Sequence, residues 1–177
     1  MPKWWEGRPW RQIQTNLRQI DMRDIDAERF VADLQSFHAT SVLLNTAGII
    51  ASYPTKLPFH TQSAYLQGDS LAEIIAACHR AGIRVLAHTD FSKVRRPIYE
   101  AHPDWAYRTA DGQIVDYNGD VHVCVAGDYQ QIYALQIIDE ALTTLDVDGV
   151  FFNMGGFQTR DYSGVYYGPC HCTACQR

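Results

Sequence analysis

The chain has 177 residues, of which 46% are hydrophobic and 20% charged, and its formal net charge is −5. This composition is typical of one globular domain, and the acidic balance argues against a basic surface for nucleic acid. No apolar run approaches the roughly 20 residues of a membrane-spanning helix, and the N-terminus lacks the apolar core of a signal peptide. We therefore expect a cytoplasmic protein without a membrane or nucleic-acid partner. Its five cysteines are expected to serve as metal ligands, core residues or redox groups rather than to form disulfides.

Short apolar runs that fit β-strands alternate with amphipathic stretches that fit helices. Strands are expected at residues 11–20, 41–48, 83–90 and 148–156. The first helix is expected to follow Asp26 as its N-cap, the second to open with a capping box of Ser70 and Glu73, and the third to begin near Asp128. The third helix is expected to direct four side chains inward: Leu135, Ile138, Leu142 and Leu145.

This alternation predicts an α/β fold with a parallel sheet, either doubly wound or a (β/α)8 barrel. No G-x-G-x-x-G follows the first strand, so dinucleotide binding has little support. Each expected strand turns polar at its carboxyl end, as strands do at the active-site face of a barrel. A whole barrel needs roughly 250 residues. We therefore predict that residues 1–177 form the N-terminal half of a (β/α)8 TIM barrel, with about four βα units. The polar residues at the strand ends are Asn16, Arg18, Asn45, His88, Asp90 and Asn153.

The stretch CHCTAC, at 170–175, has the spacing of a zinc site. A C-x-C-x-x-C loop can collect three thiolates around one ion at about 2.3 Å, and tetrahedral zinc takes a fourth ligand. His171 lies between two of the cysteines and is hard to aim at the same ion, whereas Cys124 is expected in the same layer, just before the third helix. We predict a structural Zn²⁺ site, since four protein ligands leave no open position for a catalytic water. Its ligands are Cys124, Cys170, Cys172 and Cys175.

Three segments carry a resemblance to a known family: AHPDWAYRTADGQ at 101–113, VCVAGDYQQIY at 123–133, and the stretch 148–177 with the cysteine triplet. Together they resemble the family called hypothetical glycosyl hydrolase 6 and the related glycoside hydrolase family 42, the zinc-bearing β-galactosidases. The lone cysteine followed by the triplet is the most specific part of the match. The resemblance implies a TIM barrel that acts on carbohydrate, is often trimeric and holds zinc as a structural ion.

The fourth strand departs from that family at its end. The family has an Asn–Glu pair there, in which Asn contacts the sugar 2-hydroxyl and Glu is the general acid/base. This chain has Asn153 and Met154, and a thioether cannot transfer a proton, so the resemblance carries over only the sugar-binding Asn153. Glycoside hydrolysis uses two carboxyl groups. Asp90 is the candidate here, as acid/base or nucleophile, and the second is expected beyond Arg177.

Asp90 has a competing structural interpretation, in which it caps the next segment or pairs with Lys93 or Arg95. His88 lies on the same strand face because side chains alternate with period two. A His-x-Asp pair could orient a substrate hydroxyl or form half of a catalytic metal site. Two residues of the loop after the fourth strand could also reach the sugar, or could simply be solvated. The predicted substrate-binding residues are Asn16, Arg18, Asn45, His88, Arg160 and Asp161.

The residues favour a glycoside-hydrolase-like barrel that binds and hydrolyses glycosides in the complete protein. Met154 also fits a non-catalytic carbohydrate-binding or scaffold barrel, and His88 with Asp90 fits a metal-dependent hydrolase. A half barrel exposes the edges of its first and fourth strands, and unpaired edges invite pairing. We therefore expect that the barrel continues beyond Arg177 or that the chain forms a homo-oligomer.

Overall fold

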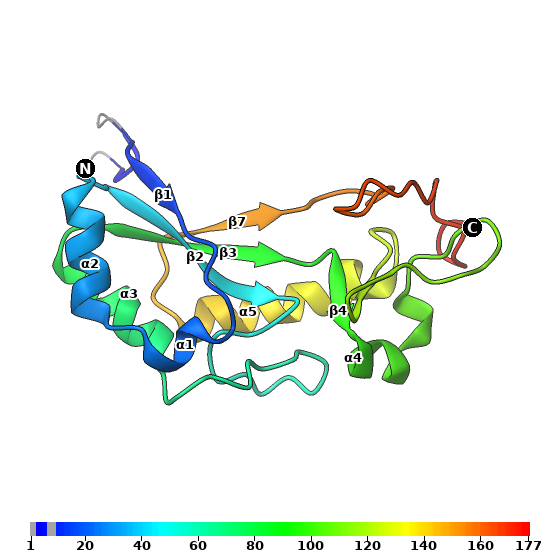
Figure 1. Ribbon diagram of the computed structural model, residues 1–177, viewed down its shortest axis with the longest axis horizontal. Helices are drawn as coiled ribbons and strands as arrows, with labels where there is room; N and C mark the ends of the chain where they lie inside the picture. Colours follow the sequence, from blue (N-terminus) through cyan, green and yellow to red (C-terminus); the bar gives the residue numbers. More distant parts are fainter. Residues whose placement is uncertain (1–2, 7–9) are drawn as a thin grey trace.

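The computed structural model describes residues 3–6 and 10–177, and a parallel sheet of four strands runs through it (Figure 1). Neighbouring strands lie in the order β1-β2-β3-β7, and every pair is parallel. This order follows the chain, as it does in a barrel, and confirms the α/β fold of barrel type. Among the described residues the sheet does not close on itself. The strands are β1 (Gln12–Gln14), β2 (Ser41–Gly48), β3 (Arg84–Asp90) and β7 (Gly149–Asn153).

The helices that connect these strands gather on one side of the sheet (Figure 1). Asp26 caps α2 as predicted, since its Oδ1 accepts a hydrogen bond from Arg29 N at 3.0 Å. The predicted capping box of Ser70 and Glu73 is wrong. Ser70 is already the first residue of α3, and its hydroxyl instead donates to the carbonyl of Met22 at 3.3 Å. The helices are α1 (Asp21–Asp24), α2 (Ala27–Ser36), α3 (Ser70–Arg80) and α5 (Ala134–Thr144).

The core lies between the sheet and these helices. It is formed mainly by side chains of the strands and helices that are at most 2% exposed. Cys78, on the apolar face of α3, is buried with them, as predicted. Continuous burial along β2 explains why its sequence is an unbroken apolar run. These core residues include Val42, Leu44, Val85, Leu71, Ile74, Ile75 and Ile137.

The inward face of α5 differs from the prediction. Leu135 and Leu142 are 59% and 47% exposed, and Ala134, Ile137 and Ala141 pack inward instead. The other two predicted residues are confirmed, since Leu145 is buried and Ile138 packs against the core. The small alanines let this helix lie close to β2, which larger leucines would prevent. A π-helical turn, η2 (Tyr129–Tyr133), directly precedes α5 and sets the rotation at which it begins.

A second, antiparallel sheet lies beyond the carboxyl ends of β3 and β7 (Figure 1). It belongs to the long insertion, in which the sequence indicated only turns. Short helical segments accompany it, α4 (Arg96–Ala101) and η1 (Pro103–Trp105). Its strands, in the order β4-β6-β5, are β4 (Lys93–Arg95), β6 (Asp120–His122) and β5 (Asp116–Tyr117).

Two predicted strands are too long. β1 ends at Gln14, and the chain then runs as a loop into α1. β7 ends at Asn153, because Met154 has a φ of 52°, which breaks the extended conformation. No helix in the described part of the chain has the length and apolar character needed to cross a membrane.

Candidate functional site

A cavity of about 650 Å³ lies at the carboxyl ends of the four parallel strands. The strands are parallel, so their carboxyl ends meet at one edge, and residues far apart in sequence converge there. Two further charged residues, Arg95 and Asp120, reach the cavity from the antiparallel sheet. Asp120 could not be predicted as a site residue from the sequence, because the three-residue strand that carries it is too short to show a periodic pattern. The six predicted residues that line this cavity are Asn16, Arg18, Asn45, His88, Asp90 and Asn153.

Asn45 and His88 lie opposite each other on β2 and β3. Asn45 Oδ1 accepts from Leu17 N at 2.9 Å, so its amide nitrogen faces His88 Nδ1, at 3.3 Å. In the neutral ring this contact makes Nδ1 the acceptor and leaves the proton on Nε2. Burial lowers the pKa of His88, more than Asp90 raises it, and favours the neutral ring. His88 Nε2 is buried without a hydrogen-bond partner in the described structure, so it is a donor that no protein group uses.

Asp90 is held by a turn immediately after β3. Its Oδ1 accepts from both Ser92 N at 2.9 Å and Ser92 Oγ at 2.6 Å, so the capping interpretation is confirmed. Ion pairing with Lys93 or Arg95 is not observed, since Arg95 instead pairs with Asp120 at 3.0 Å. Both bonds to Ser92 use one oxygen, so the other oxygen of Asp90 has no partner among the described residues.

Asp120 is the second carboxylate on the cavity. Burial raises its pKa, and the nearby Asp90 charge adds to this, while Arg95 and Lys93 act in the opposite direction. A carboxyl group whose pKa is raised keeps its proton to higher pH than an exposed one. Asp120 and Asp90 therefore lie on one cavity in different environments, the arrangement that separates an acid from a base.

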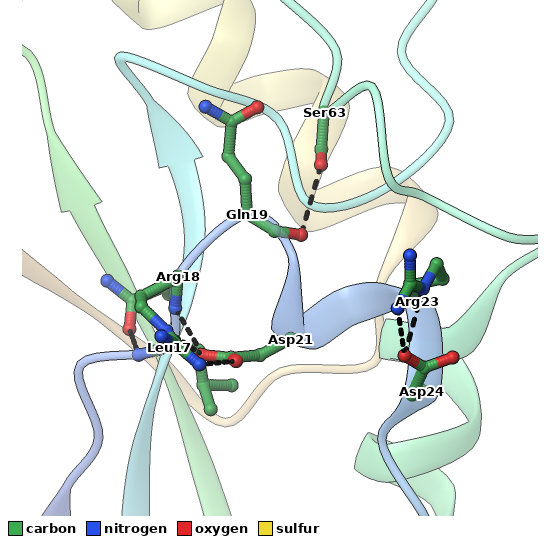
Figure 2. Close-up of polar contacts among 8 residues, drawn as sticks. Leu17, Arg18, Gln19, Asp21, Arg23, Asp24 and Ser63 are labelled. Atoms are coloured by element: carbon green, nitrogen blue, oxygen red, sulfur yellow. Dashed lines mark hydrogen bonds and ion pairs between the residues drawn. The ribbon is translucent and has the colours of Figure 1, made fainter.

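Arg18 reaches the cavity from the loop that follows β1 (Figure 2). Its guanidinium forms an ion pair with Asp21 at 2.7 Å, and Arg18 N donates to Asp21 Oδ2 at 2.7 Å. The Arg18 side chain is 77% exposed, so it lies at the rim. Gln19 lies in the same loop as Arg18, and Ser63 lies in the loop after β2. The hydroxyl of Ser63 donates to the carbonyl of Gln19 at 3.5 Å, and this bond joins the two loops (Figure 2).

Arg160 and Asp161 do not line this cavity. They line a separate cavity of about 60 Å³, on the side of the antiparallel sheet nearer the C-terminal loop. Asp161 is held in its own loop, where Tyr167 OH donates to its Oδ2 at 2.6 Å and lowers its pKa. Arg160 NH1 donates to the carbonyl of Gly164 at 3.0 Å. The structure therefore separates these two residues from the other predicted sugar ligands.

The predicted cysteine cluster comes together in the C-terminal loop. The four sulfur atoms lie within 4.8 Å of one another, and no other group of at least three His, Cys, Asp or Glu ligands converges in residues 3–6 and 10–177. His171 is exposed and outside the group, while its backbone N–H donates to the carbonyl of Arg108. This donor set could hold a metal ion, whereas His88 and Asp90 have no converging third ligand in the same residues. The cluster consists of Cys124, Cys170, Cys172 and Cys175.

Backbone contacts support this cluster. Arg108 N donates to Cys170 Sγ at 3.5 Å, and Cys172 N donates to the same sulfur at 3.5 Å. Tyr107 is fully buried beside the cysteines, and its hydroxyl donates to the carbonyl of Gly168. The insertion and the C-terminal loop therefore meet at the four sulfurs, far from the helices that cover the sheet (Figure 1).

The family model of hypothetical glycosyl hydrolase 6 matches residues 26–154, well over half of the chain. This chain belongs to the hypothetical glycosyl hydrolase 6 family. The match includes Asn45, His88, Asp90 and Asn153, but not the cysteine triplet. No curated protein sequence matches the chain significantly.

Several solved glycosidases have a similar fold. The α-L-fucosidase isoenzyme 2 from Paenibacillus thiaminolyticus superimposes with a TM-score of 0.73 at 21% identity, over 96% of this chain and 25% of that one. The β-galactosidase from Marinomonas ef1 gives 0.61 at 13% identity, over 92% and 23%. A hypothetical protein from Ruminiclostridium thermocellum gives 0.64 at 11% identity, over 88% and 84%. The chain thus spans about a quarter of the length of the two glycosidases, and these likenesses establish the fold alone.

Proposed function

We propose that this chain binds the sugar of a glycoside and supplies part of the catalytic site of a glycoside hydrolase. The observation that carries the proposal is the cavity at the strand ends, on which six polar residues of four parallel strands and their loops converge. The family and the glycosidase fold support it. Because the chain corresponds to about a quarter of the two glycosidases, we also propose that residues 1–177 are the N-terminal portion of the barrel.

The cavity offers the groups that a sugar ring requires. His88 Nε2 is a free donor, and the side-chain amide of Asn153, opposite Asp90 on the neighbouring strand, can donate to and accept from ring hydroxyls. Such groups hold the sugar in one orientation while water is excluded. Asn16 and Arg18 close the site from the loop after β1.

Asp90 and Asp120 are our candidates for the two carboxyl groups of the reaction. Asp120, with its raised pKa, suits a proton donor to the leaving oxygen, and Asp90 suits the ionised partner as base or nucleophile. Asp120 is an alternative within this chain to a second carboxylate beyond Arg177. A hydrolase and a sugar-binding scaffold differ here, because only the hydrolase needs these groups to exchange protons.

Asp90→Asn distinguishes the two functions. With a panel of p-nitrophenyl glycosides, we expect the variant to lose at least about 100-fold in turnover, while NMR titration shows unchanged affinity for the sugar. Asp33→Asn, at an exposed position on α2, is the control and should keep full turnover. In the full-length protein, sugar binding without turnover would support the scaffold function. A chain that binds no glycoside would contradict both.

We propose that the four cysteines bind a structural Zn²⁺ that joins the insertion to the C-terminal loop. Four thiolates complete a tetrahedral shell, so the ion would stabilise the fold without contacting substrate. Metal analysis should find one zinc per chain, and chelation should lower the melting temperature. Cys124→Ser should abolish zinc binding, whereas Cys78→Ala, in the core, should keep the zinc stoichiometry. A wild-type chain without bound zinc would contradict the proposal.

Within residues 3–6 and 10–177, no strand pairs with the outer edge of β7, and this supports an association that completes the sheet. Phe151 and Phe152 on this strand are 38% and 57% exposed, although strands of a closed barrel are covered on both sides. A downstream segment or a second copy of the chain would cover them. A cytoplasmic location stays a prediction from the sequence.

A further inference from the structure

Two of the polar side chains that line the small cavity have fewer hydrogen-bond partners than they can bind. Its volume, about 60 Å³, is near the space that two water molecules occupy in the liquid, and a carboxylate or sulfate group is of comparable size. Its wall is formed by one face of the antiparallel sheet and by the loop after β7. The lining residues are Lys93, His122, Met154, Arg160, Asp161 and Tyr162.

Lys93 and His122 are buried although both are polar, with 4% and 1% of their surface exposed. Lys93 Nζ donates to Ser92 Oγ at 3.2 Å and lies 5.2 Å from the centre of the Tyr162 ring. No carboxylate oxygen of the described residues lies within 4.0 Å of this ammonium. An ammonium has three N–H donors, so at least one is left for a ligand. A buried charge without a counter-ion costs several kcal/mol.

His122 is short of partners as well. Neither ring nitrogen has a partner with hydrogen-bond geometry in the described structure, although the backbone of Gln158 lies nearby. A neutral imidazole carries one N–H donor. The two buried side chains therefore present donors from neighbouring strands to the same small space.

The other charged groups around the cavity are already engaged. Asp161 accepts from Tyr167 OH at 2.6 Å and from backbone N–H groups of its own loop, while Arg160 binds a carbonyl of that loop. Arg95 NH1 lies 3.0 Å from Asp120 Oδ1, so this arginine already has an oxygen partner. Asp90 binds Ser92, which stands between it and Lys93. Lys93 and Arg160 both lack a carboxylate partner among the described residues, but Arg160 is exposed to solvent, so Lys93 is the buried cation of this group.

One face of the antiparallel sheet joins the two cavities. In the register of β4 and β6, Lys93 is opposite His122, and Arg95 is opposite Asp120. Side chains two residues apart point to the same face, so these four groups form one array. Its Arg95–Asp120 half lines the large cavity, and its Lys93–His122 half lines the small one.

We propose that the small cavity is a subsite for an anionic group, a carboxylate or sulfate, carried by the sugar that occupies the large cavity. Lys93 supplies the charge, and His122 supplies a hydrogen bond. The substrate class is then an acidic glycoside, a uronide or a sulfated sugar, and this inference rests on the proposed sugar-binding function.

The lysine composition of the chain allows a direct test. The sequence contains three lysines, Lys3, Lys56 and Lys93, so a chain labelled with ¹³C and ¹⁵N in lysine gives three side-chain signals. The labelled chain is titrated with two acidic sugars, methyl glucuronide and methyl galactoside 6-sulfate, and with their uncharged counterparts, methyl glucoside and methyl galactoside. Sodium sulfate is titrated as the free anion. We expect the Lys93 signal to shift saturably with the acidic sugars and with sulfate, while Lys56, which is exposed, stays in place.

Variants provide the second measurement. Lys93→Gln should weaken binding of the acidic glycosides at least tenfold and leave the uncharged ones unchanged, and Lys56→Gln should alter neither. If Lys93→Gln fails to fold, the labelled wild-type chain still decides the question. An unmoved Lys93 signal with both acidic sugars and with sulfate would overturn the proposal. A shift with sulfate, without binding of any glycoside, would retain the anion site and contradict the sugar-binding function.

Discussion

The two ends of the parallel sheet use aspartate in opposite ways. At the amino end, Asp148 accepts hydrogen bonds from His79 Nε2 at 2.9 Å, Arg84 NH1 at 2.7 Å and Val85 N at 2.8 Å. At the carboxyl end, Asp90 accepts from Ser92 alone, and through one oxygen. The first aspartate has little capacity left for a ligand, whereas the second keeps an oxygen free.

Histidines show the same contrast. His79, at the amino end, contacts Asp148 at 2.9 Å and Asp146 at 3.4 Å. His88, near the carboxyl end of β3, and His122, on β6, each have at least one buried ring nitrogen without a partner among the described residues. Unsatisfied buried groups reduce stability. Among the described residues, Ser41 Oγ at the start of β2 is the exception, and the other such atoms lie toward the carboxyl end. This distribution indicates that the carboxyl end is adapted to bind a ligand and the amino end to hold the fold together.

The largest expected loss of stability comes from adding a methyl group to Gly48, at the carboxyl end of β2. Gly48 has a φ of +115°, and a Cβ there would overlap the carbonyl of Asp90 on the neighbouring strand. Gly48→Ala combines this clash with backbone strain, so we expect a loss of at least about 3 kcal/mol in urea unfolding, or no folding. Gly112→Ala has a similar φ of +81° but open space around it, and should cost about 1 kcal/mol. Equal losses would show that the close approach of β2 and β3 has no energetic role.

Asp148→Asn tests the saturated end. The amide keeps the shape but loses the charge that binds Arg84 and His79, so we expect a loss of about 2–3 kcal/mol in unfolding free energy. Asp146 is the control, because it also contacts His79 but its side chain is 95% exposed. Asp146→Asn should cost less than about 0.5 kcal/mol. If both variants lose the same unfolding free energy, the buried hydrogen bonds of Asp148 do not account for the loss.

Acid titration should reveal the same network. Burial raises the pKa of Asp148, but hydrogen bonds from Val85, His79 and Arg84 outweigh it and lower the pKa overall. The stabilisation is therefore complete above the unfolded value of about 4 and is lost as the pH falls through the folded pKa. We expect the stability difference between wild type and Asp148→Asn to be constant from about pH 5 to 7 and to shrink below about pH 4. A difference that is constant down to about pH 2 would contradict this.

Asp90→Asn should change stability less than Asp148→Asn does. The carbonyl oxygen of the substituted amide would still accept from Ser92, so we expect a change below about 1 kcal/mol in chemical unfolding, alongside the loss of turnover predicted above. A loss above about 2 kcal/mol would mean that Asp90 is a structural residue like Asp148.

Much of the parallel sheet is predictable because each strand is marked by a pattern of neighbouring residues. β2 has the predicted bounds, and β3 begins one residue later than expected, since buried parallel strands are continuous apolar runs. The first strand is overestimated because residues 15–20 leave the sheet so that Leu17 N can bind Asn45. β4, β5 and β6 are too short for a periodic pattern, and β4 and β6 pair although they lie more than twenty residues apart in the chain.

The sequence alone determined the strand–helix alternation, the polar ends of the strands and the members of the cysteine cluster, Cys124, Cys170, Cys172 and Cys175. Apolar runs, caps and cysteine spacing are properties of neighbouring residues, so they can be read without a structure. Only the tertiary structure placed Asp120 beside Asp90 on one cavity and moved Asp161 to another. Strand register and the packing of the insertion decide such placements, and both depend on contacts between residues distant in the chain.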